Sequence, residues 1–429
     1  MKTLVAIITT VLVTSASFAE PPATTSAPSP PQATWLQWRG PTRDGMIRDD
    51  GWPKALQGDA LTLVWRVELG DGYSSPIVDS NRVFTFETRG RSQEVVRALD
   101  RTTGKQLWTA TWGAGMNVPF FAASNGSWVR STPACDGKSL YVGGMRDLLV
   151  CLDTTAGKEK WQVDFLKRYG TPLPSFGLVS SPLVVEDGLY IQAGGSFVKL
   201  DKKSGETLWR TLEDGGGMYG GAFSSPMLGI LCQRPQVVVQ TRTLLAGVEP
   251  KTGQVLWKQA VEAFRGMNIL NPTVFGDSVF TSSYGGGTIL LGLDRQEEAF
   301  SIRTVWKTRS EGYMSTPVVI DGKAYLYRRD RSFSCVDMAS GRELWVTQEK
   351  FGQYWSLVSN GTLILALDQK GELLLIRASP EKFDLLDRRR VSTAQTWAHL
   401  VVCGEEIFVR EQRAIAAYRW REVTSKSGQ

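Results

Sequence analysis

The side chains that most often carry catalysis are few in this sequence and are not grouped. The 429 residues include one histidine, His399, so a histidine-rich zinc site, a relay of two histidines and a Ser-His-Asp triad have little support. Two Ser-x-x-Lys strings begin at Ser196 and Ser379, but the first lies in a strand-like stretch and the second in a turn. Neither offers the helix that acyl-serine chemistry needs. We predict no catalytic residue and leave enzymatic activity undecided, with a non-enzymatic function favoured.

The cysteines do not form a recognisable metal or redox motif. There are five of them, an odd number, and no Cys-x-x-Cys, haem-attachment string or adjacent pair occurs. Most lie in apolar, strand-like runs, where a thiol behaves as a small buried hydrophobe. Cys135 and Cys151 belong to one repeat, and they are the one pair that the spacing leaves open as a disulfide.

The net charge of +6 reflects 49 lysines and arginines against 43 aspartates and glutamates. Basic runs occur at 328–331 and 388–390, but acidic residues are interleaved along almost the whole chain. A nucleic-acid-binding protein usually gathers its basic residues on one face. We therefore interpret these charges as a solvated surface and expect no nucleic acid among the partners.

The first residues predict export. Lys2 provides a positive start, residues 4–13 an apolar run and residues 17–19 a cleavage site, which together indicate a signal peptide over 1–19. That run is too short to cross a bilayer as a helix, and no later run reaches about 18 apolar residues, so we expect no integral membrane span. No cysteine precedes Cys135, so none is available for lipid attachment near the N-terminus. We expect a periplasmic or secreted protein.

One pattern recurs along the chain: an acidic residue, a turn that contains glycine, and a tryptophan eight positions after the acid. Its well-spaced copies start at Asp100, Asp153, Asp201, Glu249 and Asp337. A stretched copy runs from Asp294 to Trp306, and weak copies lie near Arg377 and Arg419. The mean spacing of about 46 residues suits the four-stranded blade of a β-propeller.

A second signal precedes most copies: Ser, Thr or Asn followed by proline, then a short apolar strand. It occurs at Pro76, Pro133, Pro182, Pro226, Pro272 and Pro317. Proline suits the first residue of a strand, where no ladder hydrogen bond is lost. Asp-Gly or Asn-Gly hairpin turns follow most of these strands. Each unit therefore reads as four antiparallel strands.

Eight such units predict an all-β fold, an eight-bladed β-propeller of four-stranded antiparallel blades over residues 61–420. The last unit, from Trp397 to Trp420, has only three strands, and residues 61–67 have the character of the missing fourth. We predict that this N-terminal strand closes the eighth blade as its outermost strand, because closure removes an exposed edge. The remaining segments are a disordered Pro/Ser/Thr linker at 20–34, a leader at 35–60 and a tail at 421–429.

Fifteen tryptophans are an unusually large number for a chain of this length. A tryptophan on an outer strand can wedge between neighbouring blades and bury on the order of 200 Å². We assign this structural role of blade docking to Trp65, Trp108, Trp161, Trp209, Trp257, Trp306 and Trp345.

The Asp-x-x-Thr-Gly-x-x-x-Trp repeat resembles the PQQ-binding-like, quinoprotein-type propeller repeat, and the resemblance covers roughly residues 61–420. Residues 35–45, which begin Trp-Leu-Gln-Trp-Arg-Gly-Pro, also resemble the segment that opens many secreted bacterial proteins of this type. The repeat family includes the outer-membrane assembly lipoprotein BamB and the larger PQQ-dependent alcohol dehydrogenases. The resemblance implies the fold but no single activity, because propellers host many unrelated functions.

A dehydrogenase of this family would imply PQQ over the channel with Ca²⁺ beside it, a vicinal disulfide that stacks on the quinone, and a catalytic Asp. No Cys-Cys pair occurs in this sequence, and no Asp aligns with the catalytic one. The best candidates for oxygen ligands are Asn268 and Asn271, and two amides without an anchored carboxylate make a poor Ca²⁺ site. We therefore expect no cofactor and no metal, and PQQ with Ca²⁺ is the alternative.

Aromatic and polar residues recur just before the inner strands, a place that lies around one mouth of a propeller's central channel. The candidates for binding there are Tyr73, Trp128, Arg130, Asn268, Asn271, Tyr313, Trp355 and Trp397. Phe176, Phe223 and Tyr354 share the position. One interpretation is that these residues pack between blades near the axis. The other is a ring that stacks on a ligand or grips a loop of a partner.

The leading hypothesis is an exported, non-enzymatic propeller that acts as a binding scaffold. It would bind a protein, a cell-envelope component or a small ligand through one face or through the channel mouth. A role in cell-envelope assembly, like that of BamB, is one version of this hypothesis. The alternatives are a PQQ-dependent quinoprotein and a carbohydrate-binding propeller, the latter suggested only by the channel aromatics.

Overall fold

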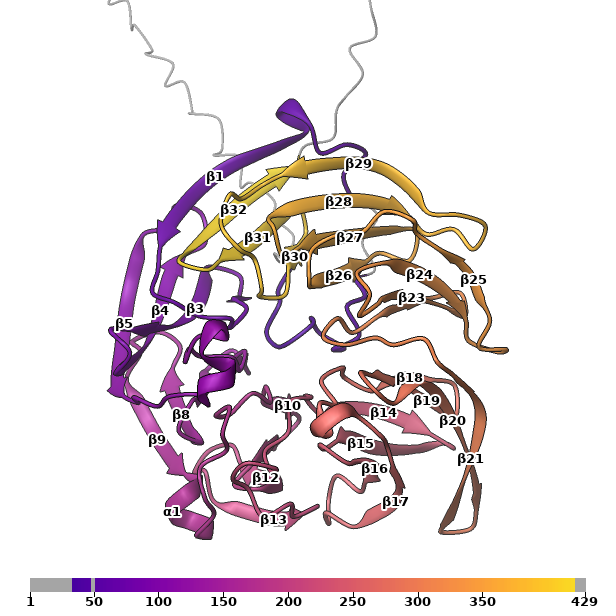
Figure 1. The fold of residues 1–429 in the computed structure, drawn as a ribbon. Coiled ribbons are helices and arrows are strands. Elements are labelled where there is room, and N and C mark those ends of the chain that lie inside the picture. The colour runs from indigo at the N-terminus through magenta and orange to yellow at the C-terminus, as the bar shows by residue number, and fades with distance from the viewer. Residues whose placement is uncertain (1–32, 48–50, 421–429) are drawn as a thin grey trace, which may run out of the picture. The chain divides into compact units, whose positions relative to one another are not determined.

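The computed structural model describes residues 33–47 and 51–420. The predicted signal peptide (1–19), nearly all of the predicted linker and the predicted tail (421–429) lie outside these residues. The described part contains eight four-stranded antiparallel sheets, arranged as the blades of a propeller around a central channel (Figure 1). The predicted fold class is confirmed.

Blades 1 to 7 each run from an innermost to an outermost strand in chain order. The strands of blades 1 to 4 are β2 (Ile77–Val78), β3 (Arg82–Arg89), β4 (Gln93–Asp100), β5 (Gln106–Gly113); β6 (Ala134–Cys135), β7 (Ser139–Gly144), β8 (Leu148–Asp153), β9 (Glu159–Asp164); β10 (Leu183–Val185), β11 (Gly188–Ala193), β12 (Ser196–Asp201), β13 (Thr207–Thr211); and β14 (Met227–Leu231), β15 (Arg234–Gln240), β16 (Leu244–Val248), β17 (Val255–Ala260). Those of blades 5 to 7 are β18 (Thr273–Phe275), β19 (Ser278–Ser283), β20 (Gly287–Gln296), β21 (Ala299–Thr308); β22 (Val318–Ile320), β23 (Lys323–Tyr327), β24 (Phe333–Asp337), β25 (Glu343–Val346); and β26 (Trp355–Ser359), β27 (Leu363–Asp368), β28 (Glu372–Arg377), β29 (Asp384–Arg390).

Blade 8 is built from both ends of the described chain. It contains β30 (Val401–Cys403), β31 (Glu406–Glu411), β32 (Ala414–Trp420) and β1 (Leu61–Glu68). β1 pairs antiparallel with β32, with Leu61 opposite Trp420 and Glu68 opposite Ala414. β1 is the outermost strand of this blade, so the predicted closure by the N-terminal strand is confirmed.

The helices are short and lie outside the sheets. They are η1 (Gly58–Ala60), η2 (Phe120–Asn125), α1 (Phe165–Tyr169) and η3 (Phe264–Gly266). Within residues 33–47 and 51–420, none is long and apolar enough to cross a membrane.

The middle strands of each blade are apolar on both faces because neighbouring blades cover both faces. All six residues of β7 are buried, and so are all six of β11. Outer strands alternate instead, as in β5, whose residues are mostly exposed or half-buried. The core therefore consists of several clusters at blade interfaces, such as the one in which Phe84 and Val96 of blade 1 pack with Leu140 and Val150 of blade 2.

The repeated turn docks blades 1, 2, 3, 4 and 6 onto the tryptophan of the blade before each of them. In blade 1, the Asp100 carboxylate accepts hydrogen bonds from the backbone N–H of Thr102 and Thr103, which fixes the turn. Gly104 then has φ +72°, and a Cβ on it would lie 2.8 Å from Cδ2 of Trp65 in blade 8. The same arrangement places Gly157 on Trp108, Gly205 on Trp161, Gly253 on Trp209 and Gly341 on Trp306. Glycine is required here because no side chain fits against the indole.

Most docking tryptophans also donate a hydrogen bond to the next blade. In six cases the indole N–H donates to a backbone oxygen. The pairs are Trp65 to Arg101, Trp108 to Thr154, Trp161 to Lys202, Trp209 to Pro250, Trp306 to Met338 and Trp345 to Ser379. Trp257 differs, because its Nε1 donates to Gln236 Oε1 in its own blade, at 2.7 Å. Blade 5 has a long β20–β21 hairpin in place of the glycine turn, so it offers Trp257 no such acceptor. Trp257 still packs with apolar residues of blade 5.

Hydroxyl and amide side chains next to the inner-strand prolines join neighbouring blades around the channel. Six backbone N–H groups donate to a side chain of the next blade over 2.7–3.1 Å: Ser75 to Thr132, Thr132 to Ser181, Ser181 to Ser225, Ser225 to Asn271, Asn271 to Thr316 and His399 to Ser75. Blades 6, 7 and 8 are joined in the opposite sense, by Trp355 N–H to Ser315 and by Leu400 N–H to Ser356. The repeated Ser/Thr-Pro signal therefore marks a joint between blades.

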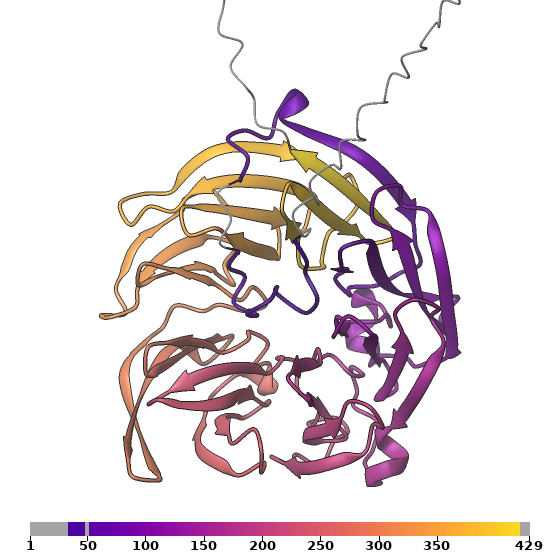
Figure 2. The same ribbon diagram turned by 180° about the vertical axis from the view of Figure 1, so that it is seen from behind.

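The leader loops from the edge of the propeller into its centre (Figure 2). Trp35 forms two backbone hydrogen bonds with Val78, at the end of β2. The backbone on either side of Met46 hydrogen-bonds Ser359, at the end of β26. Between these two anchors, Arg39 and Arg43 enter the channel and are almost completely buried.

All five cysteines are free. Cys135 packs in the cluster between blades 1 and 2, whereas Cys151 packs in the cluster between blades 2 and 3. The two thiols therefore lie on opposite faces of blade 2, and the disulfide that the spacing left open is not formed.

Candidate functional site

The connections between blades and the hairpins between the second and third strands of each blade lie on one face of the propeller, which we call the connection face. This follows from the antiparallel order of the strands. The inner strands begin at this face and end at the opposite one. The described part of the leader contacts the ends of β2 and β26, so these contacts lie at the opposite face.

Four of the predicted mouth residues come together at the connection face. The rings of Tyr73 and Trp128 lie 5.4 Å apart, and those of Tyr73 and Trp397 lie 6.1 Å apart. The guanidinium of Arg130 lies 5.2 Å from the centre of the Tyr73 ring, and burial lowers the pKa of Arg130. Tyr354 extends the row by stacking on Trp397. These rings are half-buried, apart from Tyr354, which is buried, so part of their surface is open to a ligand.

Tyr313 belongs to a different group on the same face. Its ring lies 5.8 Å from that of Tyr284, which in turn lies 4.7 Å from Phe264. The guanidinium of Arg329 lies 3.6 Å from the centre of the Tyr284 ring, a short cation–π contact. The predicted ring of aromatic residues is thus divided into separate groups.

Trp355, Asn268 and Asn271 lie inside the protein, and this corrects their predicted position at the mouth. The Trp355 ring is fully buried, stacks on Tyr327 at 4.7 Å, and its Nε1 donates to Asp368. Asn268 donates to Arg242 O and is also fully buried. Asn271 Oδ1 accepts from Ser225 N–H, so this side chain joins blades 4 and 5.

The connection loops of blades 1 to 5 carry an exposed apolar surface that the sequence analysis missed. Phe120 is 91% exposed and Tyr219 is 80% exposed. We use the name apolar loop surface for the five residues Phe120, Phe121, Met218, Tyr219 and Phe264. They precede the inner strands by several residues, so a search restricted to positions next to the Ser/Thr-Pro signal passes over them.

Phe176, Phe223 and Arg242 hold these loops together. The Phe176 ring lies 6.4 Å from that of Phe121 and 5.5 Å from that of Phe223. The Arg242 guanidinium lies 4.8 Å from the centre of the Phe223 ring. It also donates to the backbone oxygens of Met218 at 3.1 Å and Arg265 at 2.5 Å. One side chain thus ties the connection from blade 3 to blade 4 to the connection from blade 4 to blade 5.

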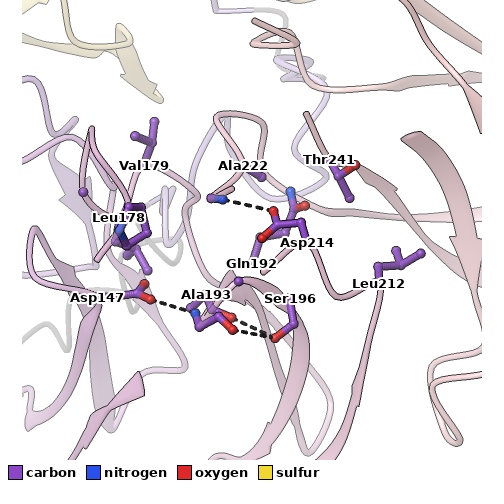
Figure 3. Close-up of a pocket in the computed structure, with 15 residues that line it drawn as sticks. Asp147, Leu178, Val179, Gln192, Ala193, Ser196, Leu212, Asp214, Ala222 and Thr241 are labelled. Carbon is purple, nitrogen blue, oxygen red and sulfur yellow. Dashed lines mark hydrogen bonds between the residues drawn. The ribbon is translucent and has the colours of Figure 1, made fainter. Parts of the chain in front are cut away.

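A small cavity lies within the connection-face loops of blades 2 to 4 (Figure 3). Its volume of about 10 Å³ suits a single water-sized group. On one side, the Asp147 carboxylate accepts from Gly194 N–H at 2.8 Å, and burial raises its pKa to about 7. On the other side, Asp214 accepts from the backbone N–H groups of Gly216 and Gly221 and so orders a glycine-rich loop. The two carboxylates therefore order the loops around this cavity, and the cavity is too small for an organic ligand.

Sequence comparison assigns the chain to a family. The model of the family described as outer membrane protein assembly factor BamB matches residues 91–347 and, in a second and overlapping match, residues 297–394. The chain belongs to this family. The BamB of Yersinia pestis is 22% identical over 376 residues, which cover 83% of this chain and 88% of that protein.

Solved structures share the fold of this BamB-family chain. The crystal structure of BamB from Moraxella catarrhalis has a TM-score of 0.60 at 15% identity and covers 84% of this chain and 98% of that one. The quinohemoprotein alcohol dehydrogenase from Comamonas testosteroni has a TM-score of 0.59 at 13% identity and covers 92% of this chain and 82% of that one. At these identities the likeness concerns the fold alone.

The side chains that the sequence offered for PQQ with Ca²⁺ are engaged elsewhere in this BamB-family chain. Among the described residues, no three His, Cys, Asp or Glu side chains group as metal ligands. Asn268 and Asn271, the best oxygen ligands from the sequence, are buried in contacts with the protein's own backbone. The sequence also holds no adjacent pair of cysteines to stack on a quinone. We derive no reaction step through this cofactor.

Proposed function

We propose that this chain is a cell-envelope assembly scaffold of the BamB type, which binds a protein partner with the connection face of blades 1 to 5. The apolar loop surface is the observation that carries the proposal. Large hydrophobic side chains that stay exposed together on loops mark an interaction site in a soluble protein. Membership in the BamB family supports a protein partner in outer-membrane assembly and a location in the cell envelope.

The charges beside this surface support a particular kind of partner. Arg146 and Arg265 are exposed on the connection face, and among the described residues neither forms an ion pair. The Arg146 guanidinium donates only to Gly115 O, and that of Arg265 lies over the ring of Phe264. Cations placed beside exposed aromatic rings suit a segment that carries acidic and apolar residues together. We propose that the partner supplies such a segment.

A genetic experiment tests this function. We expect that deleting the gene from its own host lowers the amount of assembled outer-membrane protein, and that the wild-type gene restores it. A double variant, Phe120→Ser with Tyr219→Ser, removes the two most exposed rings and should fail to restore it. The matched control is Leu107→Ser with Leu208→Ser, which changes two exposed leucines on the outer strands β5 and β13. Full restoration by the Phe120/Tyr219 variant would refute the proposed surface.

We propose that this function needs no cofactor. The test is to titrate the purified protein with PQQ and CaCl₂ and to follow its melting temperature. A ligand that binds only the folded state must raise that temperature in a saturable way. A flat titration is the expected outcome, and saturable stabilisation would favour the quinoprotein alternative.

A further inference from the structure

Two arginines of the leader are buried in the channel. Arg39 is 1% exposed and Arg43 is 2% exposed. Arg39 donates to the backbone oxygens of Thr316, Pro317 and Asp44, and its Nη1 lies 3.4 Å from Nε2 of His399. Within the described chain, neither arginine takes part in an ion pair. A buried charge is costly unless it is paired.

Arg43 is the less satisfied of the two. It donates to Pro182 O at 2.9 Å and to Ser181 O at 3.0 Å, while its buried Nε has no partner. Burial lowers the pKa of Arg43 to about 9 and that of Arg39 to about 10. His399 does not balance these charges, because its ring is neutral. Burial and the neighbouring Arg39 lower its pKa to about 3. Arg39 is fully hydrogen-bonded, since its Nε also donates to Arg43 O at 3.3 Å, whereas Arg43 keeps an unpartnered Nε.

Both arginines line a cavity of about 210 Å³ at the leader's face of the propeller. Besides the bonds described above to blades 1, 3, 6, 7 and 8, Leu36 O of the leader accepts from Cys135 N–H of blade 2. The cavity lies where the leader faces the inner strands of blades 4 and 5. The wall on that side is apolar and includes Leu228 of β14 and Val274 of β18. The cavity is therefore cationic on one side and apolar on the other.

Among the described residues that line this cavity, only Asp44 carries a carboxylate. Its Oδ1 accepts from Thr42 Oγ1 and from Met46 N–H, so it is held by the leader itself. Two guanidinium groups and one carboxylate leave a net charge of about +1 at the site. That balance suits a ligand with one negative charge, and a planar carboxylate can accept two hydrogen bonds from a guanidinium.

We propose that this cavity binds a small organic monocarboxylate, with its carboxylate at the guanidinium of Arg43, close to the charge of Arg39, and its apolar body against Leu228 and Val274. The site is separate from the apolar loop surface, because none of the five residues of that surface lines the cavity. A bound carboxylate would also tie the leader to blades 4 and 5, to which the described part of the leader forms no hydrogen bond.

Benzoate is the probe for a first test, because it combines one carboxylate with an apolar ring. The melting temperature of the protein is measured against benzoate, neutral benzamide and inorganic phosphate at constant ionic strength. We expect saturable stabilisation by benzoate, none by benzamide and less by phosphate. Equal shifts with benzamide would overturn the role of the arginines, and equal shifts with phosphate would overturn the role of the apolar wall. No shift with benzoate would overturn the proposal as a whole.

A pair of variants on β14 locates the site. Leu228→Glu places a carboxylate at the rim of the cavity, where it competes with the ligand for the guanidinium groups. Ile230→Glu makes the same change two residues further along the strand, at a side chain that does not line the cavity. Both side chains are partly exposed, 38% and 67%, so both variants should fold. By calorimetric titration, we expect Leu228→Glu to bind benzoate at least tenfold more weakly and Ile230→Glu to bind it as the wild type does. Unchanged binding by Leu228→Glu would refute the location.

Discussion

Replacing Gly157 with alanine tests the contact that joins the blades. Gly157 lies in the turn of blade 2, at φ +68°, against the Trp108 ring of blade 1. A Cβ at this position would lie 2.4 Å from Cε3 of Trp108, well inside van der Waals contact. The indole must move, and its hydrogen bond to Thr154 O, 3.0 Å long, then breaks.

Three costs contribute to the expected loss of stability. An alanine at positive φ costs about 1–2 kcal/mol. Overpacking against a buried ring costs about 1–3 kcal/mol, and the lost hydrogen bond costs about 1 kcal/mol. We expect Gly157→Ala to lower the free energy of unfolding by about 3–6 kcal/mol in total.

Gly137→Ala is the matched control. Gly137 lies in the same blade, at φ +92°, but no atom lies within 4 Å of a Cβ built on it. This variant therefore pays only the backbone cost of about 1–2 kcal/mol. The assay is urea unfolding followed by circular dichroism, with the midpoints of both variants compared to that of the wild type. Equal losses in the two variants would refute the docking role of the tryptophan.

Three further predictions concern the channel, the leader and a buried carboxylate. Ser181→Ala leaves the buried N–H of Thr132 without its acceptor, so unfolding free energy should fall by about 1–3 kcal/mol; an unchanged urea midpoint would contradict this. Arg39→Ala removes the hydrogen bonds that hold the leader in the channel, so limited proteolysis should cut residues 35–47 faster than in the wild type. Because the pKa of Asp147 is raised to about 7, its carboxyl stays protonated in the folded protein between about pH 4 and 7, where the unfolded chain has lost this proton. The free energy of unfolding of the wild type should therefore fall as pH rises through this window. Asp147→Asn stays neutral, can still accept from Gly194 N–H and tolerates the positive φ, so its melting temperature should fall less from pH 5 to pH 8.

The fold could be predicted from the sequence because its local signals are repeated. The turn that begins at Asp100 specifies its own geometry through side-chain hydrogen bonds, and the glycine that follows specifies a contact with the preceding blade. The stretched copy that begins at Asp294 signalled a different turn, and the structure gives its consequence in the hydrogen bond of Trp257 to its own blade. The closure by β1 followed from counting strands.

The candidate site was predicted only in part. Tyr73, Trp128, Arg130 and Trp397 were found because they lie four to six residues before an inner strand. Trp355 is instead the first residue of the inner strand β26, and it packs in the interface between blades 6 and 7, where Tyr327 and Asp368 hold it. Periodicity gives the position of a residue along the chain, and it does not give the rotamer that the neighbouring blade selects.

The apolar loop surface and the buried arginines could not be found from the repeat, because they lie in segments that do not repeat. Phe120 and Tyr219 stand in connections of different length, and only the fold brings these connections to one face. Arg39 and Arg43 looked like ordinary charges of a leader, and their burial depends on a path through the channel that no local pattern encodes.

Site-specific crosslinking in the host cell tests the proposed partner surface most directly. A photoreactive phenylalanine analogue is placed at Tyr219, on the connection face, and in a second protein at Leu107, on the outer strand β5. We predict that irradiation joins the Tyr219 protein to one defined cell-envelope protein, identified by mass spectrometry, and that the Leu107 protein does not form this product. The same product from both positions, or none from Tyr219 and none from Phe120 replaced in the same way, would contradict the proposal that the connection face binds a partner.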